Sequence, residues 1–488
     1  MTGHCDIGLI GLAVMGQNLI LNMNDHGYKV AAYNRTTART EAFLAGPAKG
    51  TQVVGTTTLE EFITTLSIPR KVMLMVKAGD TVDKVIAQLL PLLDAGDVII
   101  DGGNTNYSDS ERRTLELKEQ GILFIGTGVS GGEEGARHGP SIMPGGNPDA
   151  WPLVKEILQA IAAKTPEGIP CCDWVGSNGA GHFVKMVHNG IEYGDMQLIC
   201  EAYQFMHDQL GMDNAAMQQT FARWGQGDLK SYLIEITADI LGFQDDEGYV
   251  VDRILDKAGQ KGTGKWTGIN ALDFGIPLTL IVEAVLARSL SSLKAERVTA
   301  SAILKGPNPT DAVTMTDAER DEWLDALEQA LLAAKMVSYA QGFMLMREAS
   351  DEYQWDLQYG AIAQLWQEGC IIRSVFLKDI KAAYDKDAGL SNLLIDDYFR
   401  DKLQGAQTGW RKVLSRAVET GVPMPAMGSA LAFYDGYRSE RLPANLLQAQ
   451  RDYFGAHTYE RVDKPLGEYF HSNWTGTGGD VSSTTYEV

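Results

Sequence analysis

Short apolar runs alternate with amphipathic segments of helix length from the N-terminus to about residue 178. The predicted strands are residues 5–10, 28–33, 71–77, 97–101 and 122–125, and the predicted helices include residues 15–26, 80–93 and 107–120. Gly27 is expected to end the first helix, because glycine is common just after a helix C-terminus. Strands that alternate with helices build a mainly parallel sheet covered by helices. The pattern therefore predicts an α/β domain with a doubly wound sheet.

The strand pattern then stops, and long helical patterns follow. One of them opens with the capping box Thr316-Asp-Ala-Glu319, and its apolar positions continue from Trp323 to Leu332. The sequence thus predicts an α/β domain at 1–178, a large all-α domain at 179–440 and a short C-terminal tail at 441–488. Residues 475–488 are rich in Gly, Ser and Thr, and they would form either a disordered tail or an arm ordered by another subunit.

One helical segment, residues 179–193, carries four polar residues on a single face. Lys185, His188, Asn189 and Glu192 fall at i, i+3, i+4 and i+7. A lysine that can act as a base, a carboxyl that can act as an acid and two groups that can hold a substrate thus line one stripe. This stripe predicts that the helix forms one wall of a catalytic site. The alternative is a solvated polar face, which such stripes commonly are.

The turn between the first predicted strand and helix contains a nucleotide-binding motif. It reads Gly11-Leu12-Ala13-Val14-Met15-Gly16, a variant of the dinucleotide fingerprint in which Ala13 replaces the middle glycine. Gly11 allows the tight turn and Gly16 the close packing of helix on strand, so pyrophosphate would bind at the helix N-terminus near Val14. Because the motif opens a βαβ unit, the sequence predicts a Rossmann-type domain.

The residues after the second predicted strand indicate which dinucleotide binds. An Asp or Glu there would accept from the ribose hydroxyls and favour NAD, but this chain has Asn34-Arg35-Thr36. A guanidinium beside amide and hydroxyl donors suits a 2′-phosphate, so we expect NADP. The alternative is that Arg35 is only a surface residue of the following turn.

Three further segments are expected at the ligand-binding edge of the sheet. Val76-Lys77-Ala78 and the loop from Asp101 to Asn104 are expected to flank the nicotinamide end, with Asp101 bracing its loop. Residues 126–140 are predicted to form a glycine-rich loop. In it, Ser130-Gly131-Gly132 offers a hydroxyl and unhindered N–H groups to a carboxylate or sugar oxygen, or simply permits a turn.

Charge and composition narrow the range of partners. A net charge of −21 repels polyanions, so nucleic acid and anionic membranes are poor candidates, and a small anionic ligand needs its own cluster of cations. No run approaches the roughly 18 apolar residues of a membrane span. The five scattered cysteines indicate reduced thiols in a cytoplasmic protein, and no Cys or His spacing indicates a metal site.

Eight segments together carry a resemblance that extends over nearly the whole chain. They are residues 11–16, 34–36, 76–78, 128–136, 181–193, 261–267, 366–373 and 451–457. In order and spacing they resemble the decarboxylating 6-phosphogluconate dehydrogenase family. The resemblance implies oxidation of 6-phospho-D-gluconate by NADP⁺ to D-ribulose 5-phosphate, CO₂ and NADPH without a metal ion. It also implies a cytoplasmic homodimer that serves the pentose phosphate pathway and gluconate utilization.

The resemblance also implies residue roles. Lys185 would take the proton from the C3 hydroxyl as hydride leaves, and would then donate it to the carbonyl oxygen as CO₂ departs. Glu192 would protonate C1 of the enediol. These roles require a lowered pKa for Lys185 and a raised pKa for Glu192. His188 and Asn189 are expected to orient the substrate hydroxyls, and Asn104 to lie near cofactor and substrate together.

The two ends of the substrate are assigned in the same way. Tyr193, Lys261, Thr263 and Arg288 are expected around the phosphate, and Ser130, Gly131 and Gly132 around the carboxylate. Arg288 lies in an apolar helical run, so we expect a buried cation with a partner. Residues 261–265 form a basic glycine loop that suits phosphate, or else a surface turn. Arg451 and His457 are expected to reach the active site of the other subunit.

Three other functions remain open at this point. A β-hydroxyacid dehydrogenase for a short acid such as 3-hydroxyisobutyrate would share the fold and the Lys–Asn helix, but it predicts neither the phosphate cations nor the extra helical length. A metal-dependent reductoisomerase would need an acidic metal cluster, which residues 179–196 do not clearly supply. A catalytically inactive NADP-binding scaffold or sensor predicts loss of Lys185 or Glu192, and both are present.

Overall fold

The computed structural model describes residues 4–308, 315–478 and 483. The chain forms two units, Met1–Ala430 and Leu431–Val488. Residues 479–482 and 484–488, at the end of the tail predicted from sequence, lie outside the described residues. In the part of the chain that is described, no helix has the length and apolar character needed to cross a membrane.

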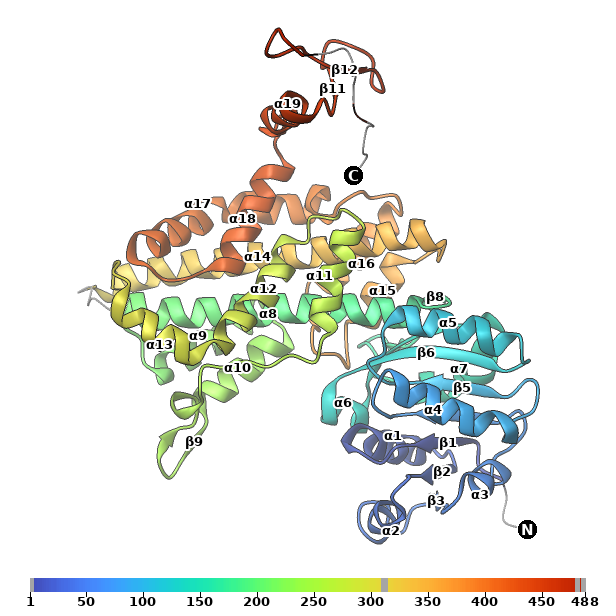
Figure 1. Cartoon of the computed structure of the whole chain (residues 1–488). Helices are drawn as coiled ribbons and strands as arrows, with labels where there is room; N and C mark the ends of the chain where they lie inside the picture. The colour runs from blue at the N-terminus through green and yellow to red at the C-terminus, as the bar shows by residue number, and fades with distance from the viewer. Residues whose placement is uncertain (1–3, 309–314, 479–482, 484–488) are drawn as a thin grey trace. The chain divides into compact units, whose positions relative to one another are not determined.

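The first unit begins with an eight-stranded sheet of order β3-β2-β1-β4-β5-β6-β7-β8 (Figure 1). The strands are β1 (Ile7–Ile10), β2 (Val30–Tyr33), β3 (Val54–Gly55), β4 (Lys71–Leu74), β5 (Val98–Asp101), β6 (Leu123–Ser130), β7 (Ser141–Gly146) and β8 (Gly176–Ser177). Neighbouring strands are parallel, except that β6 and β7 are antiparallel. The strand order reverses between β1 and β4, which is where open α/β sheets bind their ligands.

Apolar side chains bury both faces of this sheet. On one face, α1 (Val14–Asp25) and α7 (Trp151–Ile161) pack against side chains such as Ile7 and Leu9. On the other face, the strands alternate their side chains toward α3 (Leu59–Thr64), α4 (Asp80–Leu89) and α5 (Tyr107–Lys118). Helices α2 (Thr37–Ala45) and α6 (Gly132–His138) complete this part. The predicted doubly wound α/β fold is confirmed.

The prediction of a loop at 126–140 is wrong. Strand β6 continues to Ser130, α6 follows at once, and β7 begins at Ser141. Gly126 and Gly128 resemble loop residues in the sequence, yet here they let the N-terminal turns of a long helix approach the strand. A Cβ at Gly126 would lie 2.7 Å from His182 Nδ1, and one at Gly128 would lie 2.6 Å from Lys185 Cγ. Both distances are too short for real contacts, so the close helix packing requires glycine.

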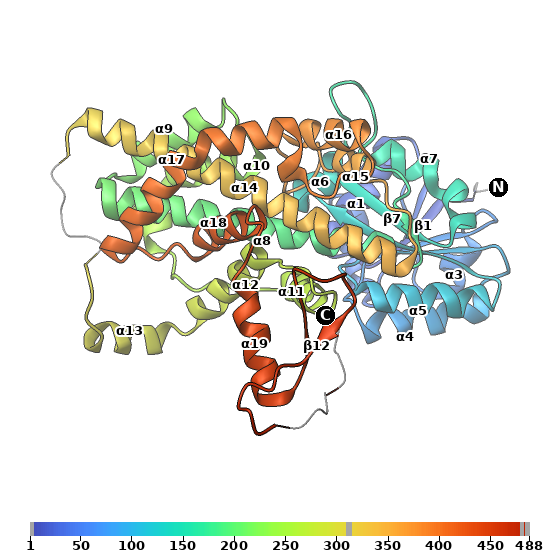
Figure 2. The same cartoon turned by 90° about the horizontal axis from the view of Figure 1, so that it is seen from above.

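The rest of the first unit is helical. Its helices are α8 (Ala180–Leu210), α9 (Asn214–Trp224), α10 (Tyr232–Gly242), α11 (Thr263–Asp273), α12 (Thr279–Ser292), α13 (Lys294–Ile303), α14 (Asp317–Tyr353), α15 (Tyr359–Leu365), α16 (Leu377–Lys386), α17 (Asp397–Thr420) and the start of α18 (Pro425–Tyr437). Helix α14 packs against α8 on one side and α17 on another (Figure 2). The predicted capping box opens α14.

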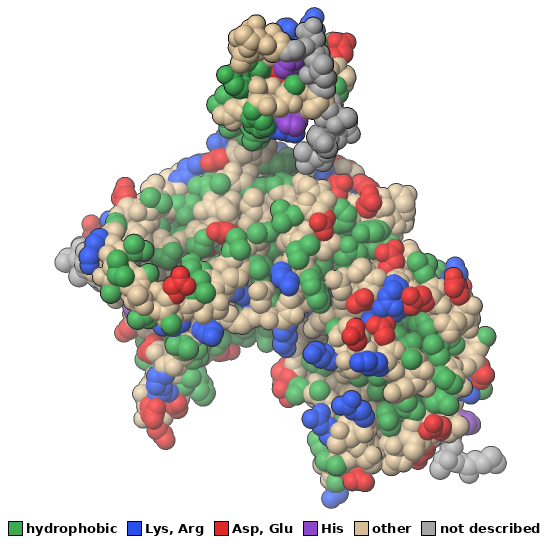
Figure 3. All heavy atoms as spheres, in the orientation of Figure 1, with side chains coloured by type: hydrophobic (Ala, Val, Ile, Leu, Met, Phe, Trp, Pro, Cys, Tyr) green, Lys and Arg blue, Asp and Glu red, His purple; other side chains and the backbone are tan. Residues whose placement is uncertain are grey.

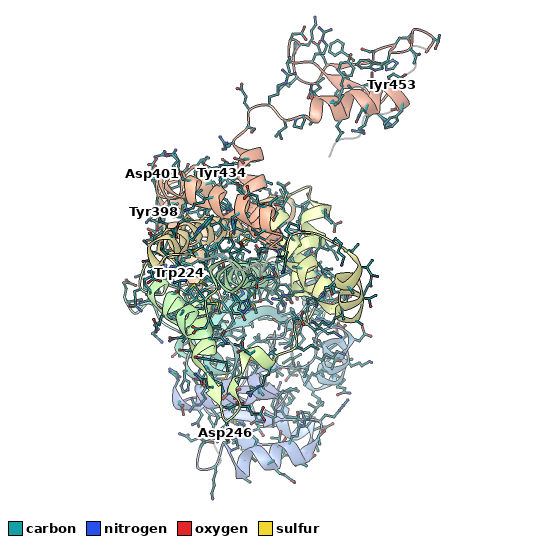
Figure 4. The ribbon with its side chains drawn as sticks, turned by 90° about the vertical axis from the view of Figure 1, so that its left-hand side faces the viewer. Trp224, Asp246, Tyr398, Asp401, Tyr434 and Tyr453 are labelled. Carbon is teal, nitrogen blue, oxygen red and sulfur yellow. The ribbon has the colours of Figure 1, made fainter. Side chains whose placement is uncertain are left out.

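One small sheet interrupts this helical part. Strands β9 (Gln244–Asp245) and β10 (Gly248–Tyr249) form an exposed hairpin whose tip carries Asp246 (Figure 4). The sequence analysis did not predict this hairpin, because strands of two residues are too short to show an alternating pattern.

The second unit contains the end of α18, then α19 (Ala444–Gly455) and an antiparallel hairpin of β11 (Tyr459–Glu460) and β12 (Tyr469–Phe470). A few residues of the chain separate α19 from this hairpin, and they include His457. Arg451 lies on α19 itself.

Candidate active site

Helix α8 carries the predicted stripe from the end of the sheet into the helical part (Figure 1). Lys185, His188 and Asn189 are 6%, 0% and 8% exposed, and the Glu192 side chain is 22% exposed. A solvated polar face is therefore excluded. Polar side chains buried to this extent need hydrogen-bond partners, and the stripe supplies several of them internally.

His188 is the centre of a hydrogen-bond chain across the stripe. Its Nδ1 lies 3.1 Å from Asn189 Oδ1 and 3.3 Å from Lys185 Nζ, and its Nε2 lies 3.1 Å from Ser130 Oγ. Burial, followed by the nearby Lys185 ammonium, lowers the pKa of His188 well below its ordinary value, so the ring is neutral. With its proton on Nδ1, the ring donates to Asn189 and accepts from Ser130. Asn189 Nδ2 in turn donates to Thr263 Oγ1 over 3.1 Å.

The two titratable ends of the stripe have pKa values displaced in opposite directions. Burial lowers the pKa of Lys185 to about 8, although the Glu192 carboxylate opposes this shift. Burial raises the pKa of Glu192, and the positive charges of Lys185 and Arg288 oppose it. A lysine that is partly neutral near neutral pH is a competent base, and a carboxyl with a raised pKa is a competent acid.

A cavity of about 650 Å³ lies over this pair, between the end of the sheet and the helices. The predicted residues that line it are Met15, Asn104, Ser130, Gly131, Gly132, Lys185, Asn189, Glu192, Tyr193, Lys261, Thr263 and Arg288. His188 does not line it, because this ring is completely buried behind Ser130 and Asn189. The structure thus brings together residues that are far apart in the sequence.

One end of this cavity is cationic. The Arg288 guanidinium stacks on the Tyr193 ring at 3.5 Å, and its Nη1 donates to Gly259 O over 3.3 Å. The expectation that Arg288 is buried is wrong, since it is half-buried: α12 turns this side of the helix toward the cavity rather than toward the core.

Thr263 is the first residue of α11, so the predicted loop at 261–265 is in fact a helix N-terminus, which favours anions.

The dinucleotide motif borders two further cavities. One of about 380 Å³ is lined by Ala13, Val14, Met15, Gly16, Val76, Lys77 and Asn104 among others, and it shares Met15 and Asn104 with the larger cavity. Another of about 430 Å³ is lined by Leu12, Ala13 and Val14 together with Arg39. Gly11, Asn34, Arg35, Thr36 and Ala78 line neither of them.

The turn that holds the motif has the geometry that a dinucleotide requires. Gly11 has φ +111°, and a Cβ there would lie 2.9 Å from the Met75 backbone carbon. Helix α1 begins at Val14, which lines both cavities, so the helix N-terminus, a site that favours anions, adjoins them. Asn34 braces the turn, because its Oδ1 accepts from Leu12 N over 3.2 Å. These residues fit a dinucleotide.

The chain matches two family models that together span nearly all of it. Residues 6–176 match the NAD binding domain of 6-phosphogluconate dehydrogenase, and residues 181–474 match the C-terminal domain of 6-phosphogluconate dehydrogenase. The chain belongs to the 6-phosphogluconate dehydrogenase family.

Full-length relatives of this family agree with the assignment. The chain is 63% identical over 484 residues to the decarboxylating 6-phosphogluconate dehydrogenase of Haemophilus influenzae, with 99% of each chain covered. It is 60% identical over 486 residues to that of Homo sapiens, covering 99% of this chain and 100% of the human one. A solved Plasmodium falciparum 6-phosphogluconate dehydrogenase, studied with NADP⁺ and with 6-phosphogluconate, matches with a TM-score of 0.92 and 45% identity over 96% of this chain and 100% of that one.

Several residues that line these cavities were not predicted from the sequence. Gln260, Met196 and Ile371 line the large cavity, and Arg39 lines the cavity next to the motif. Arg39 had a usable signal, because it is a second cation on the first turn of the helix that follows Arg35. Ile371 lies within the segment 366–373 that carries the resemblance.

Arg451 and His457 belong to the second unit. Among the residues that the structure describes, no group of three or more His, Cys, Asp and Glu side chains is arranged to hold a metal ion.

Proposed function

We propose that this chain oxidises and decarboxylates 6-phospho-D-gluconate with NADP⁺, giving D-ribulose 5-phosphate, CO₂ and NADPH. The observation that carries the proposal is the pair Lys185 and Glu192, whose pKa values are displaced in opposite directions at the floor of a cavity that adjoins the dinucleotide motif. A hydroxy acid needs both a base and an acid to complete this reaction.

Lys185 and Glu192 act in sequence on the substrate. NADP⁺, held beside the motif residues that line the adjoining cavity, would supply the acceptor for the hydride of C3. Neutral Lys185 takes the proton of the C3 hydroxyl, leaving a 3-keto acid and a protonated lysine. The bond between C1 and C2 then breaks, its electron pair moves toward the C3 carbonyl, and Lys185 returns its proton to that oxygen. Glu192 finally protonates the resulting enediol at the carbon that lost CO₂, while Lys185, neutral again, takes the proton of the hydroxyl at the former C3, which leaves the ketone of D-ribulose 5-phosphate.

The remaining residues of the cavity hold the substrate. Tyr193, Lys261, Thr263 and Arg288 bind the phosphate, and Ser130, Gly131 and Gly132 bind the carboxylate end. Asn189 orients the hydroxyls directly, His188 acts through Ser130 and Asn189, and Asn104 lies between substrate and cofactor. A slightly larger cavity of about 680 Å³ is a poor alternative site for this anion, because Asp173, Asp351, Asp356 and Asp385 line it.

The cofactor-binding residues are those of the motif and the two loops beside it. They are Gly11, Leu12, Ala13, Val14, Met15, Gly16, Asn34, Arg35, Thr36, Val76, Lys77, Ala78 and Asn104. Arg35 binds the 2′-phosphate from the exposed end of β2, and Arg39 adds a second cation nearby. Because no carboxylate follows β2, NADP is preferred over NAD.

The active enzyme is a homodimer in which Arg451 and His457 complete the substrate site of the other subunit. Helices α12 and α13 support a dimer, because Leu286, Leu290 and Val298 are 54%, 59% and 57% exposed. Exposed apolar surface of this kind marks an interface. The chain then serves as a cofactor domain at 1–178, a substrate and dimerisation domain at 179–440 and a tail at 441–488 that reaches the partner. The enzyme acts in the cytoplasm, in the pentose phosphate pathway and gluconate utilization.

The direct test measures absorbance at 340 nm after 6-phosphogluconate is added with NADP⁺ or NAD⁺ in the absence of metal, with released CO₂ measured in parallel. Equal amounts of NADPH and CO₂, with little response to NAD⁺, are expected. NADPH without CO₂ would instead identify a simple β-hydroxyacid dehydrogenase. Binding of NADP⁺ without turnover would identify an inactive scaffold.

A further inference from the structure

The described part of the second unit from residue 441 onward lacks the apolar core that normally holds a small unit together. Among its described residues from 441 onward, the buried ones are Asp452 and Thr458. Hydrophobic side chains lie on its surface instead (Figure 3). Tyr453, which is labelled in Figure 4, Phe454 and Leu446 are 61%, 73% and 62% exposed. The internal order of this unit therefore depends on polar contacts.

The carboxylate of Asp452 gathers those contacts. Its Oδ1 accepts from Thr458 N over 3.0 Å and lies 2.9 Å from His471 Nδ1. Its Oδ2 accepts from Ser472 N over 3.0 Å and from Trp474 Nε1 over 2.8 Å. One carboxylate on α19 thus holds the turn after the helix and the segment after β12. Burial by itself raises the pKa of Asp452, but the hydrogen bonds outweigh it and hold the pKa below its ordinary value.

The turn held in this way is the one that carries His457. Its neighbours Ala456 and Thr458 have φ values of +48° and +57°, which side chains with a Cβ rarely adopt. Thr458 is fixed on both sides, because its N–H donates to Asp452 and its carbonyl accepts from Gln448 Nε2 over 2.6 Å. Gln448 also accepts from Arg451 Nη1 over 3.1 Å. Arg451 is therefore joined, through Gln448 and Thr458, to the turn that carries His457.

We propose that Asp452 is the positioning residue of the C-terminal unit, which fixes the turn around His457 and the adjoining Arg451 so that both are presented together to the substrate of the partner subunit. The inference rests on the proposed function, which assigns these two residues to the partner's site. Its consequence is that a buried carboxylate, itself remote from the substrate, sets substrate affinity. A misplacement of about 1 Å at a binding group costs up to about 100-fold in such sites.

The test compares Asp452→Asn with Asp463→Asn. Asparagine keeps the shape of Asp452 but replaces one acceptor oxygen by an NH₂ group. This donor would then face the donor groups of the turn after α19 or of the segment after β12. Asp463 is a matched control, because it lies in the same unit, is exposed and pairs only with nearby Arg461 in the contacts that the structure describes. In the Asn variant of Asp452 we expect KM for 6-phosphogluconate to rise about 10- to 100-fold while the Kd for NADP⁺ is unchanged.

Two further measurements separate positioning from general damage. Hydrogen exchange of residues 456–474 should become faster in Asp452→Asn, while exchange of α8 and the sheet stays as in the parent chain. In a chain that already carries Arg451→Ala and His457→Ala, Asp452→Asn should change KM by less than about twofold, because it acts through those residues.

The outcomes distinguish this inference from the proposed function. If Arg451→Ala and His457→Ala leave KM unchanged, the assignment of these residues to the partner's site is wrong, and the inference falls with it. If those variants raise KM but Asp452→Asn matches Asp463→Asn, only the role of Asp452 is overturned. A raised KM without faster exchange of residues 456–474 also contradicts it.

Discussion

Helix α8 contributes to two charged pairs, whose carboxylates Glu192 and Asp195 lie about one turn apart and differ in how their charges are satisfied. Asp195 accepts from Lys335 Nζ of α14 over 2.6 Å, and both side chains are essentially unexposed. Glu192 and Lys185, by contrast, face the 650 Å³ cavity. Burial raises the pKa of Asp195 as it raises that of Glu192, so the two pairs differ in their access to the cavity and not in whether burial acts on them. A charge with a close partner stays fixed, whereas charges that face a cavity without such a partner can exchange protons with a substrate.

Replacement of Lys185 by methionine should have the largest effect. Methionine keeps most of the volume but cannot take the C3 proton, so we expect kcat to fall about 10³- to 10⁴-fold. The Kd for NADP⁺ should be unchanged, because the proposed cofactor contacts lie on the side of the sheet. Lys265→Met is the matched control, because Lys265 is an exposed lysine on α11 outside the cavity lining. A kcat close to that of the control would remove Lys185 as the base.

Replacement of Lys335 by methionine should lower the stability of the fold but leave kcat nearly unchanged, which is the opposite of the effect expected for Lys185→Met. It leaves Asp195 buried and without its partner, so we expect a loss of about 3–5 kcal/mol in the free energy of unfolding. The double variant Lys335→Met, Asp195→Leu should recover most of this loss, because an apolar pair needs no charge partner. Thermal melts measure both. For the fraction that remains folded, kcat should stay near the parent value, and a loss as large as that of Lys185→Met would abolish the contrast between the two pairs.

The sequence allowed only the cavity-facing pair to be predicted. Lys185 and Glu192 lie within one helical stripe, so local spacing reveals them. Lys335 and Asp195 are 140 residues apart, and no local pattern connects them. The alternating strands and helices were predictable for the same reason of locality. The strand character of residues 126–130 was not, because the requirement for Gly126 and Gly128 comes from His182 and Lys185 on a helix far along the chain.

Replacement of Glu192 by glutamine should lower kcat about 100-fold, because the enediol then lacks its acid. The variant also tests the electrostatic coupling of the pair. Activity requires neutral Lys185, so kcat/KM should rise with pH up to about pH 8, following the pKa of Lys185. The Glu192 carboxylate raises that pKa, so its removal should lower it further. The rising limb should therefore move to lower pH in Glu192→Gln. An unmoved limb would mean that the two groups do not interact, and an upward shift would contradict the predicted sign of the interaction.

The smallest change in activity is expected from residues at the cofactor end, because the arginines there are exposed whereas Lys185 is buried. The double change Asn34→Asp, Arg35→Glu removes the guanidinium and supplies carboxylates to the ribose hydroxyls, so the ratio of kcat/KM for NADP⁺ over NAD⁺ should fall about 10- to 100-fold. An aspartate in place of Asn34 can still accept from Leu12 N, which keeps the turn braced. Arg39→Ala, which removes only the second cation, should shift the ratio in the same direction by a smaller factor. Because Arg35 is exposed, water screens its contribution, and this places the pair below Lys185 and Glu192 in effect. If the ratio stays the same while KM for both cofactors rises equally, these residues hold the turn and do not read the 2′-phosphate.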